Sequence, residues 1–582
     1  MNERSETPRR VAATATRRAT RTASAKAAVA TRTAARKTAV KKAAPRKAAA
    51  KKNVARKTAT KATATKAAAT RKTAAKKTAT KRTPAKTAAS RRGPARKTTT
   101  SRRSDAGSAP VFIRHYCQGI GDCHLLRFVK DDGSPWHMLI DCGLHSSVPG
   151  ATQTMDAIVA DLAKLTRRID VLVITHEHWD HVSGFSTAAE HFAGIDVGEV
   201  WMAWTENARD PQAREFDQFK GKALSALQRA SLRLDGMRAL DANMSSVRNG
   251  LQALLGFQFG AKGEKVRTAR DAGAALNTEG VKYLEPSAQA LQPDGLANLR
   301  IYVLGPPRDT SYFSIRERTS EMYAATAAAA SLDQALGPDD ICAADTLAPF
   351  DPNLGLALDD AMGSGQITDG DDAALRRLVR DVYAADGSAV AAGARPTTDQ
   401  RWRRIDGDWL GASADLAMQL DDRTNNSSLV LAFEFVDSGR VLLFAADAQI
   451  GNWLSWQDLK WNVDGKSVSG PELLSRVVYY KVGHHGSRNA TARSKGLQLM
   501  NDPDLAAFVP TNQVDAKRVK WGEMPFRGIL DDLDKRADGR VIRADDAWLK
   551  SGAVDARFRK ASGALQSVAP GDDGLWVDVE VR

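Results

Sequence analysis

The sequence predicts an α/β fold that follows a long basic tail. Three apolar runs are typical of buried strands, and they occupy residues 169–175, 441–446 and 477–482. Residues 206–295 carry the apolar spacing of helices, as in FDQFKGKALSALQRASLRL. The part of the chain that follows the tail is long enough to form one large core with sizeable insertions.

The tail is defined by its charge and by the residues that it lacks. Residues 1–104 hold 33 Lys and Arg against two Glu, a net charge of +31, and contain no Leu, Ile, Phe, Trp or Tyr. Such a segment cannot bury enough apolar surface to offset its ordering entropy. We therefore predict a disordered, low-complexity tail over residues 1–108 and a folded body over residues 109–582.

The tail is expected to bind nucleic acid. Arg-Lys-Thr recurs at Arg36, Arg56, Arg71 and Arg96 between Ala, Thr and Lys spacers, and the composition resembles that of linker-histone tails. Spaced cations neutralise phosphates and release counterions, which gives sequence-independent and salt-sensitive binding to DNA or RNA. The alternative is a solubilising extension without a partner.

Composition excludes several classes of protein. The chain has no apolar run of about 18 residues, which a membrane helix needs, and its first residues lack the apolar segment of a secretory signal. Four cysteines in 582 residues are too few for a disulfide scaffold. We expect a cytoplasmic protein that associates with the nucleoid and not with membranes.

The most informative motif follows the apolar run 169–175. It reads His176, His178, Asp180 and His181, an H-x-H-x-D-H pattern. His176 and His178, two apart in an extended segment, can face one metal ion, and Asp180 and His181 on the next turn can face a second. Imidazole and carboxylate together suit Zn²⁺ or Mn²⁺. A His-rich surface loop is the alternative.

Two later segments supply further candidate ligands. Asp447 follows the apolar run 441–446, and G-H-H-G-S, with His484 and His485, follows the run 477–482. The two histidines of this motif point differently, so we expect one of them to bind metal and the other to support the site or contact substrate. The sequence leaves open which one binds.

In this order the motifs resemble those of the metallo-β-lactamase superfamily, and within it the hydrolase domain of the ComEC/Rec2 DNA-uptake family. The resemblance also rests on G-I-G-D-C from residue 119, L-I-D-C-G from residue 139 and N-N-S-S-L-V-L from residue 425. It implies an αββα sandwich with insertions at about 206–295 and 310–415, and a centre of two divalent ions, Zn²⁺ or Mn²⁺, that Asp447 bridges. The glycines and Asp122 of these motifs are interpreted as turn residues.

One departure from the family pattern concerns a further histidine ligand. Within the interval between His181 and His484 the only histidine is His191, which lies too close to the first motif. The missing histidine ligand is expected to be replaced by Asp309, Asn425, Asn426 or a water molecule. The ion at His176 and His178 is then the weaker one, and an oxygen-tolerant metal such as Mn²⁺ becomes more plausible.

These motifs favour a two-metal hydrolase with Asp180, Asp447, His484 and His485 as catalytic candidates. Two metals lower the pKa of water and neutralise charge on the attacking and leaving oxygens. The motif order and the basic tail favour a nuclease or phosphodiesterase. The alternatives are a small-molecule ester or phosphodiester hydrolase, and a nucleoid-binding protein with a non-catalytic body.

Overall fold

The computed structural model describes residues 109–236, 242–253, 264–316, 408–519 and 523–582, with a few single positions between them. The predicted basic tail lies outside the described residues, as does most of the predicted insertion at 310–415. None of the helices in the described part of the chain has the length and apolar character that a membrane crossing requires.

The first sheet has eight strands and contains the apolar run 169–175 as β4. Its β1, β2 and β3 form an antiparallel meander, and β3 to β6 are parallel. The last strand of the chain, β16, pairs with β1. In spatial order the strands are β15 (Leu565–Pro570), β16 (Trp576–Val581), β1 (Val111–Tyr116), β2 (Cys123–Val129), β3 (Pro135–Cys142), β4 (Arg168–Ile174), β5 (Asp196–Ala203) and β6 (Val281–Leu284).

The second sheet has six strands and contains the other two predicted apolar strands as β9 and β12. The strands β9, β12, β13 and β14 are parallel, whereas β7 and β8 extend the sheet with antiparallel pairs. In spatial order they are β14 (Val541–Arg543), β13 (Ala506–Val509), β12 (Val477–Lys481), β9 (Val441–Phe444), β8 (Val430–Phe435) and β7 (Leu299–Gly305). A hairpin of β10 (Lys460–Val463) and β11 (Lys466–Ser469) lies outside this sheet.

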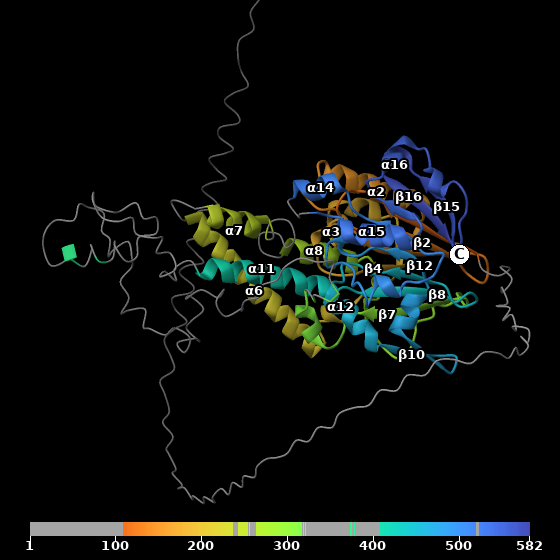
Figure 1. Cartoon of the computed structure of the whole chain (residues 1–582), viewed down its shortest axis with the longest axis horizontal. Helices are drawn as coiled ribbons and strands as arrows, with labels where there is room; N and C mark the ends of the chain where they lie inside the picture. Colours follow the sequence, from red (N-terminus) through yellow and green to blue (C-terminus); the bar gives the residue numbers. More distant parts are fainter. Residues whose placement is uncertain are drawn as a thin grey trace, which may run out of the picture. The chain divides into compact units, whose positions relative to one another are not determined.

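The two sheets face each other across one apolar core, and helices cover their outer faces. Leu126 and Val173 of the first sheet belong to the same buried cluster as Phe433 and Phe444 of the second. The helices on the first sheet are α2 (Ala151–Leu165), α3 (Trp179–Val182), α4 (Gly184–Thr187), α5 (Ala189–Phe192) and α8 (Glu264–Ala274), and those on the second include α12 (Ile450–Ser455), α13 (Gly470–Ser475) and α15 (Arg527–Arg536). The predicted α/β class and αββα sandwich are thus confirmed (Figure 1).

Three helices form a separate bundle beside the sandwich. They are α6 (Pro211–Gly236), α7 (Ala242–Ala253) and α11 (Asp408–Asn426), coloured yellow to teal in Figure 1. Leu227 and Leu234 of α6, two turns apart, pack in one buried cluster with Leu416 and Leu420 of α11. The cluster joins two helices that are more than 170 positions apart in the sequence. It places the end of α11 next to the loop after β4, where the candidate ligands lie.

Candidate metal centre

The H-x-H-x-D-H motif forms the loop after β4 and the first turn of α3. His178 has extended backbone angles, φ −115° and ψ 150°, and it precedes α3, which contains Asp180 and His181. The side chains of all four residues, His176 included, are buried. The backbone therefore changes from an extended conformation at His178 to a helical turn that contains Asp180 and His181.

The other candidate ligands come from two neighbouring loops of the second sheet. Ala446, His484 and His485 have positive φ of 46°, 42° and 51°, which non-glycine residues adopt rarely. The His484 amide donates to Ala446 O at 2.9 Å and to Asp447 Oδ1 at 3.1 Å. Backbone conformations of this kind concentrate at functional sites, and the hydrogen bonds of the His484 amide hold the two loops against each other.

Two glycines let the strands of the first sheet approach the Asp180 backbone. A Cβ on Gly143 would lie 2.3 Å from Asp180 O, and a Cβ on Gly121, whose φ is 141°, would lie 2.7 Å from the same atom. The Asp122 amide donates to Asp180 O at 3.1 Å. The interpretation of these motifs as turn residues was therefore too limited, because they position the backbone of a candidate ligand.

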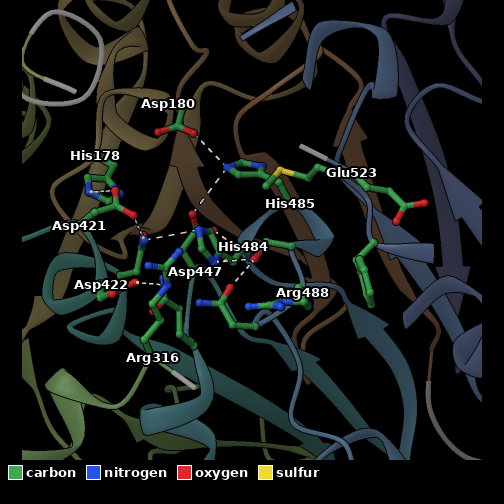
Figure 2. A pocket seen from close by; sticks show the side chains of 16 residues that line it. His178, Asp180, Arg316, Asp421, Asp422, Asp447, His484, His485, Arg488 and Glu523 are labelled. Carbon is green, nitrogen blue, oxygen red and sulfur yellow. Dashed lines mark hydrogen bonds and ion pairs between the residues drawn. The ribbon is translucent and has the colours of Figure 1, made fainter. Parts of the chain in front are cut away.

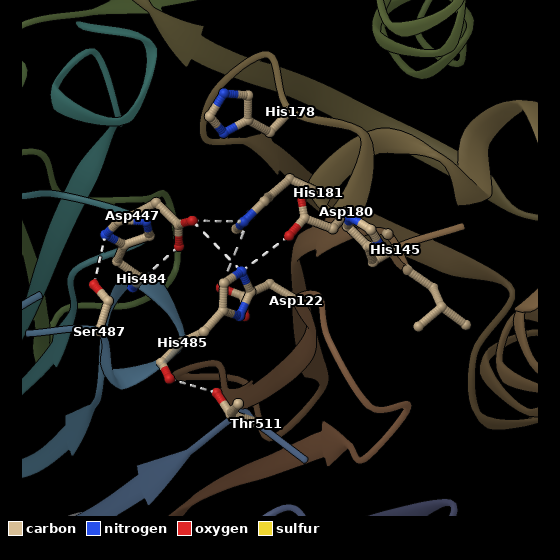
Figure 3. A network of polar contacts seen from close by, with 12 residues as sticks. Asp122, His145, His178, Asp180, His181, Asp447, His484, His485, Ser487 and Thr511 are labelled. Atoms are coloured by element: carbon tan, nitrogen blue, oxygen red, sulfur yellow. Dashed lines mark hydrogen bonds and ion pairs between the residues drawn. The ribbon is translucent and has the colours of Figure 1, made fainter. Parts of the chain in front are cut away.

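Four side chains bring their donor atoms to spacings that suit metal binding (Figure 3). His485 Nε2 lies 2.9 Å from Asp180 Oδ2, and Asp447 Oδ2 lies 3.3 Å from His181 Nε2 and 3.6 Å from His485 Nε2. Two donors bound at about 2.1 Å to one ion are about 3.0 to 3.4 Å apart in octahedral or tetrahedral geometry. The structure thus places Asp180, His181 and His485 in one group that can hold a metal ion.

His176 and His178 form a less complete second position. His176 Nε2 lies 4.0 Å from Asp447 Oδ2, and His176, His181 and Asp447 form another group that can hold an ion. His178 Nδ1 lies 3.0 Å from His176 Nε2. Among the described His, Cys, Asp and Glu residues, however, His178 belongs to no group of three with ligand atoms all close together.

The ring nitrogens that face away from the ligand atoms have partners of their own. His181 Nδ1 lies 2.8 Å from Asp141 Oδ2, and His176 Nδ1 lies 3.1 Å from Thr175 Oγ1. Asp141 also accepts from the Thr175 amide and hydroxyl. Carboxylates behind ligating imidazoles fix their tautomer and orientation. Asp141 was missed as a site residue, although the L-I-D-C-G motif contains it.

A third acidic group next to His181 is already occupied by a cation. Asp122, Asp141 and His181 could hold an ion by spacing alone, but the buried Lys481 ammonium lies against Asp122 Oδ2. Burial alone would raise the pKa of Asp122, but Lys481 and His124 hold it well below its usual range. This group supports the site as an internal ion pair.

Among the candidate ligands, three histidines have a pKa below the ordinary value and are neutral at pH 7. Burial lowers the pKa of His178 and of His484 to about 4. Burial and the neighbouring His181 hold the pKa of His176 well below its usual range. A neutral imidazole has a free lone pair on one ring nitrogen, and this is the form of histidine that binds metal.

The buried carboxylates of the cluster favour positive charge beside them. Burial alone would raise the pKa of Asp447, but His181 and His485 hold it well below its usual range. Conversely, burial would lower the pKa of His181, but Asp447 and Asp141 raise it well above its usual range. The cluster therefore attracts either a proton on its imidazoles or a metal cation, and the donor set fits a divalent ion.

Five of the ligand candidates, His178, Asp180, Asp447, His484 and His485, line a pocket of about 470 Å³ (Figure 2). Arg316 and Arg488 contribute positive charge to its walls, whereas Asp421, Asp422 and Glu523 contribute negative charge. Further lining residues are His178, Asp180, Asn425, Asp447, Gln449, His484, His485, Ser487, Asn489, Met524 and Phe526. The two arginines, the two α11 aspartates and Glu523 were not expected from the sequence.

His484 lies in the pocket wall and faces a different partner from His485. Its Nδ1 lies 2.8 Å from Ser487 Oγ, and its Nε2 lies 3.4 Å from Asn425 Nδ2. Because the Ser487 hydroxyl donates to Asn489, His484 Nδ1 carries the proton and Nε2 is an acceptor. Only His485 has its ring nitrogen against both Asp180 and Asp447.

The expected substitutes for the missing histidine lie in different places, as does His191, which was not expected to replace it. Asp309 is exposed and caps a short 3₁₀ helix at Ser311, and His191 lies on α5, away from the pocket lining. Asn426 is buried, where its Oδ1 accepts from backbone amides. Of these four residues, only Asn425 lines the pocket.

A buried charge cluster anchors the helical bundle to the metal loop. Glu177, between the two histidines of the motif, accepts from Lys220 Nζ of α6 at 2.6 Å. Glu206 lies 2.7 Å from Arg270 and 3.5 Å from Lys220. A buried carboxylate without its partners would be strongly destabilising, so α6 and α8 fix the position of this loop.

Comparison with known proteins agrees with this architecture. The family model of the metallo-beta-lactamase superfamily matches residues 120–219, which include the H-x-H-x-D-H motif, while Asp447, His484 and His485 lie beyond the match. A comparison with curated proteins found no match to this chain. Residues 120–219 therefore match a metallo-beta-lactamase superfamily domain, and the described part of the chain has His and Asp groups that can hold metal ions.

Proposed function

We propose that this protein is a metal-dependent phosphodiesterase that cleaves nucleic acid. The observation that carries the proposal is the convergence of His and Asp side chains from both sheets on a pocket that also contains two arginines. A hydrolase of anionic substrates needs such a combination, because metal ligands and cations then act on the same phosphate.

Two groups of residues would hold the ions. Asp180, His181 and His485 would hold one, His176 and His178 the other, with Asp447 within reach of both groups. When bound, divalent ions lower the pKa of water and neutralise charge on the attacking and leaving oxygens. This assignment gives His485 the ligand role that the sequence left open.

The protein's own groups would bind and orient the substrate. Arg316 and Arg488 would donate hydrogen bonds to the phosphate oxygens, for which guanidinium geometry is well suited. His484 Nε2, an acceptor in the pocket wall, would orient a water molecule or a substrate hydroxyl. The basic tail would concentrate the enzyme on nucleic acid through phosphate contacts.

A small-molecule ester or phosphodiester hydrolase is the second candidate, and the charge of the pocket favours it. Asp421, Asp422 and Glu523 lie in the pocket wall, and residues 105–582 carry 66 acidic against 52 basic residues, a net of −14. Such a body repels a long polyanion away from the arginines. A small substrate would enter this pocket without that penalty.

One parallel assay separates the candidates. Plasmid, linear DNA, RNA and bis-p-nitrophenyl phosphate are incubated with Mn²⁺, Zn²⁺ or Mg²⁺ and either wild type or Asp447→Asn. We expect cleavage of a nucleic acid that requires a divalent ion and is lost in the variant. Hydrolysis of the small diester alone favours the second candidate, and hydrolysis of no substrate in any metal contradicts both.

A further inference from the structure

Helix α11 presents Asp421, Asp422 and Asn425 to the pocket, and two of these side chains lie one helical turn apart. Asp421 and Asn425 both line the pocket near the C-terminal end of the helix. Neither belongs to the part of the chain that matches the family model. Their contacts connect two of the candidate histidines, as Figure 2 shows for Asp421 beside His178.

The Asn425 amide determines the roles of its neighbours. Its Nδ2 lies 3.2 Å from Asp421 Oδ2 and 3.4 Å from His484 Nε2. An amide nitrogen carries two hydrogens and no lone pair for hydrogen bonding, so both partners are acceptors. Asp421 is thereby oriented with its other oxygen, Oδ1, toward His178 Nε2 at 3.8 Å.

The two nitrogens of His178 face different partners. Its Nδ1 lies 3.0 Å from His176 Nε2, and its Nε2 faces Asp421. A neutral imidazole carries one proton. With that proton on Nε2, toward the carboxylate, Nδ1 presents a lone pair next to the lone pair of His176 Nε2, and the two converge on one position.

We propose that Asp421 is a positioning residue that fixes the tautomer and orientation of His178 for metal binding. The molecule contains the same arrangement at its other position, where Asp141 holds His181 Nδ1 at 2.8 Å and leaves Nε2 toward Asp447. The proposal rests on the metal centre of the proposed function and names a residue of this chain that supports its less complete half.

The distance to His178 is longer than a hydrogen bond, and it predicts a movement. The charge-assisted contact between Asp421 and the ring forms at about 2.7 to 2.9 Å, so the pair closes by about 1 Å when His178 binds an ion. Carboxylates behind ligating histidines contribute about 10- to 100-fold to metal affinity. This is the loss that we expect when the charge of Asp421 is removed.

The test measures metal binding to the full chain, without any substrate. Protein freed of metal by a chelator is titrated with Mn²⁺ and with Zn²⁺ by calorimetry, and bound ions are counted by elemental analysis. Asp421→Asn removes the charge and keeps the shape, and Asp415→Asn makes the same change on α11 outside the pocket lining. We expect one of two ions to bind about 10- to 100-fold more weakly in the first variant and no change in the second.

A double-mutant cycle shows whether Asp421 acts through His178. If it does, Asp421→Asn changes affinity by less than about twofold in a His178→Ala background, because the group on which it acts is gone. Additive losses would overturn the proposal. Unchanged affinity in Asp421→Asn, or an equal loss of both ions, would overturn it as well.

Two further measurements keep the result interpretable. The melting temperature of each variant in chelator reports folding without metal, and Asp421→Glu, which restores the carboxylate, must bind more tightly than Asp421→Asn. A wild type that binds no ion would overturn the proposed function together with this inference. Normal wild-type binding with an unaffected Asp421→Asn would overturn the inference alone.

Discussion

His485 Nε2 lies 2.9 Å from Asp180 Oδ2, although 305 positions separate the two residues along the chain. Asp180 belongs to the first turn of α3, which follows β4 of the first sheet. His485 belongs to the loop that follows β12 of the second sheet. The contact is therefore formed only when both sheets have assembled, and it brings one ligand candidate from each to the pocket.

Replacement of either partner should remove a metal ion. Asp180→Ala and His485→Ala are expected to lose one of two bound ions, because three donors are reduced to two. Elemental analysis after dialysis against a defined free-metal concentration measures the loss. His191→Ala is the matched control, since this histidine lies outside the pocket lining. Wild-type protein with no stoichiometric metal under any loading condition would contradict the metal centre.

A methyl group on Gly143 should weaken metal binding without removing a ligand. Its Cβ would lie 2.3 Å from Asp180 O, so Gly143→Ala must displace the backbone of that residue. We expect a loss of stability of about 1 to 3 kcal/mol, typical of overpacking, together with weaker binding of one ion. Urea unfolding and metal titration check both, with Gly221→Ala as control because nothing lies within 4 Å of the added atom.

The buried cluster at the metal loop should contribute stability that depends on pH. Burial alone would raise the pKa of Glu206, but Lys220 and Arg270 lower it below its usual value. A lowered carboxylate pKa stabilises the fold above the unfolded-state value of about 4.3, and this stability is lost as the pH falls through the folded-state value. Glu206→Gln should therefore cost about 3 kcal/mol at pH 7.

The measurement is urea unfolding at pH 7, 5 and 3.5. The difference between wild type and Glu206→Gln should shrink toward the lowest pH, where Glu206 of the wild type becomes protonated. Glu190→Gln, an exposed site, should show no difference at any pH. A constant difference across this range would mean that packing, and not charge, stabilises the cluster.

Removal of residues 1–108 should weaken binding to long nucleic acid and leave the chemical step unchanged. KM for long DNA is expected to rise with kcat nearly constant, because the tail binds substrate and transition state alike. For the full chain, log affinity should fall by about 0.9 per phosphate neutralised for each unit of log salt. Both proteins are assayed across a salt series on long DNA and on a small phosphodiester.

A tail of the same composition in scrambled order is the matched control, and it should restore binding if charge alone acts. Activity on the small phosphodiester should not depend on the tail. Equal activity of the two proteins on long DNA at moderate salt would show that the tail is not a substrate anchor.

Much of the sandwich could be predicted because its central strands are apolar and its ligands follow strand ends. The runs that became β4, β9 and β12 are buried almost throughout, so hydrophobicity identifies them. The H-x-H-x-D-H motif predicts its own geometry, since extended and helical turns impose fixed spacings between side chains.

The remaining features of the candidate site could not be predicted, because they depend on contacts between distant segments that no local sequence pattern encodes. Asp421 lies on a helix of ordinary composition, and its position beside His178 follows from the packing of α11 on α6. The choice between His484 and His485 follows from their positive φ angles and from hydrogen bonds to Ser487 and Asn425. The sequence did contain one signal for the internal ion pair of Asp122. A lysine at position 481 ends an apolar strand, and a buried lysine requires an acidic partner.

Because the candidate donors come from both sheets, an ion bound between them would couple metal binding to chain assembly. An ion that recognises only the assembled state raises the free energy of unfolding by RT ln(1 + [L]/Kd), about 2.7 kcal/mol at a free concentration one hundred times Kd. If the centre binds metal, the heat resistance of this protein in a cell extract would report how much metal the compartment supplies. Metal starvation would thus lower the amount of intact protein as well as its turnover, through increased exposure to proteases.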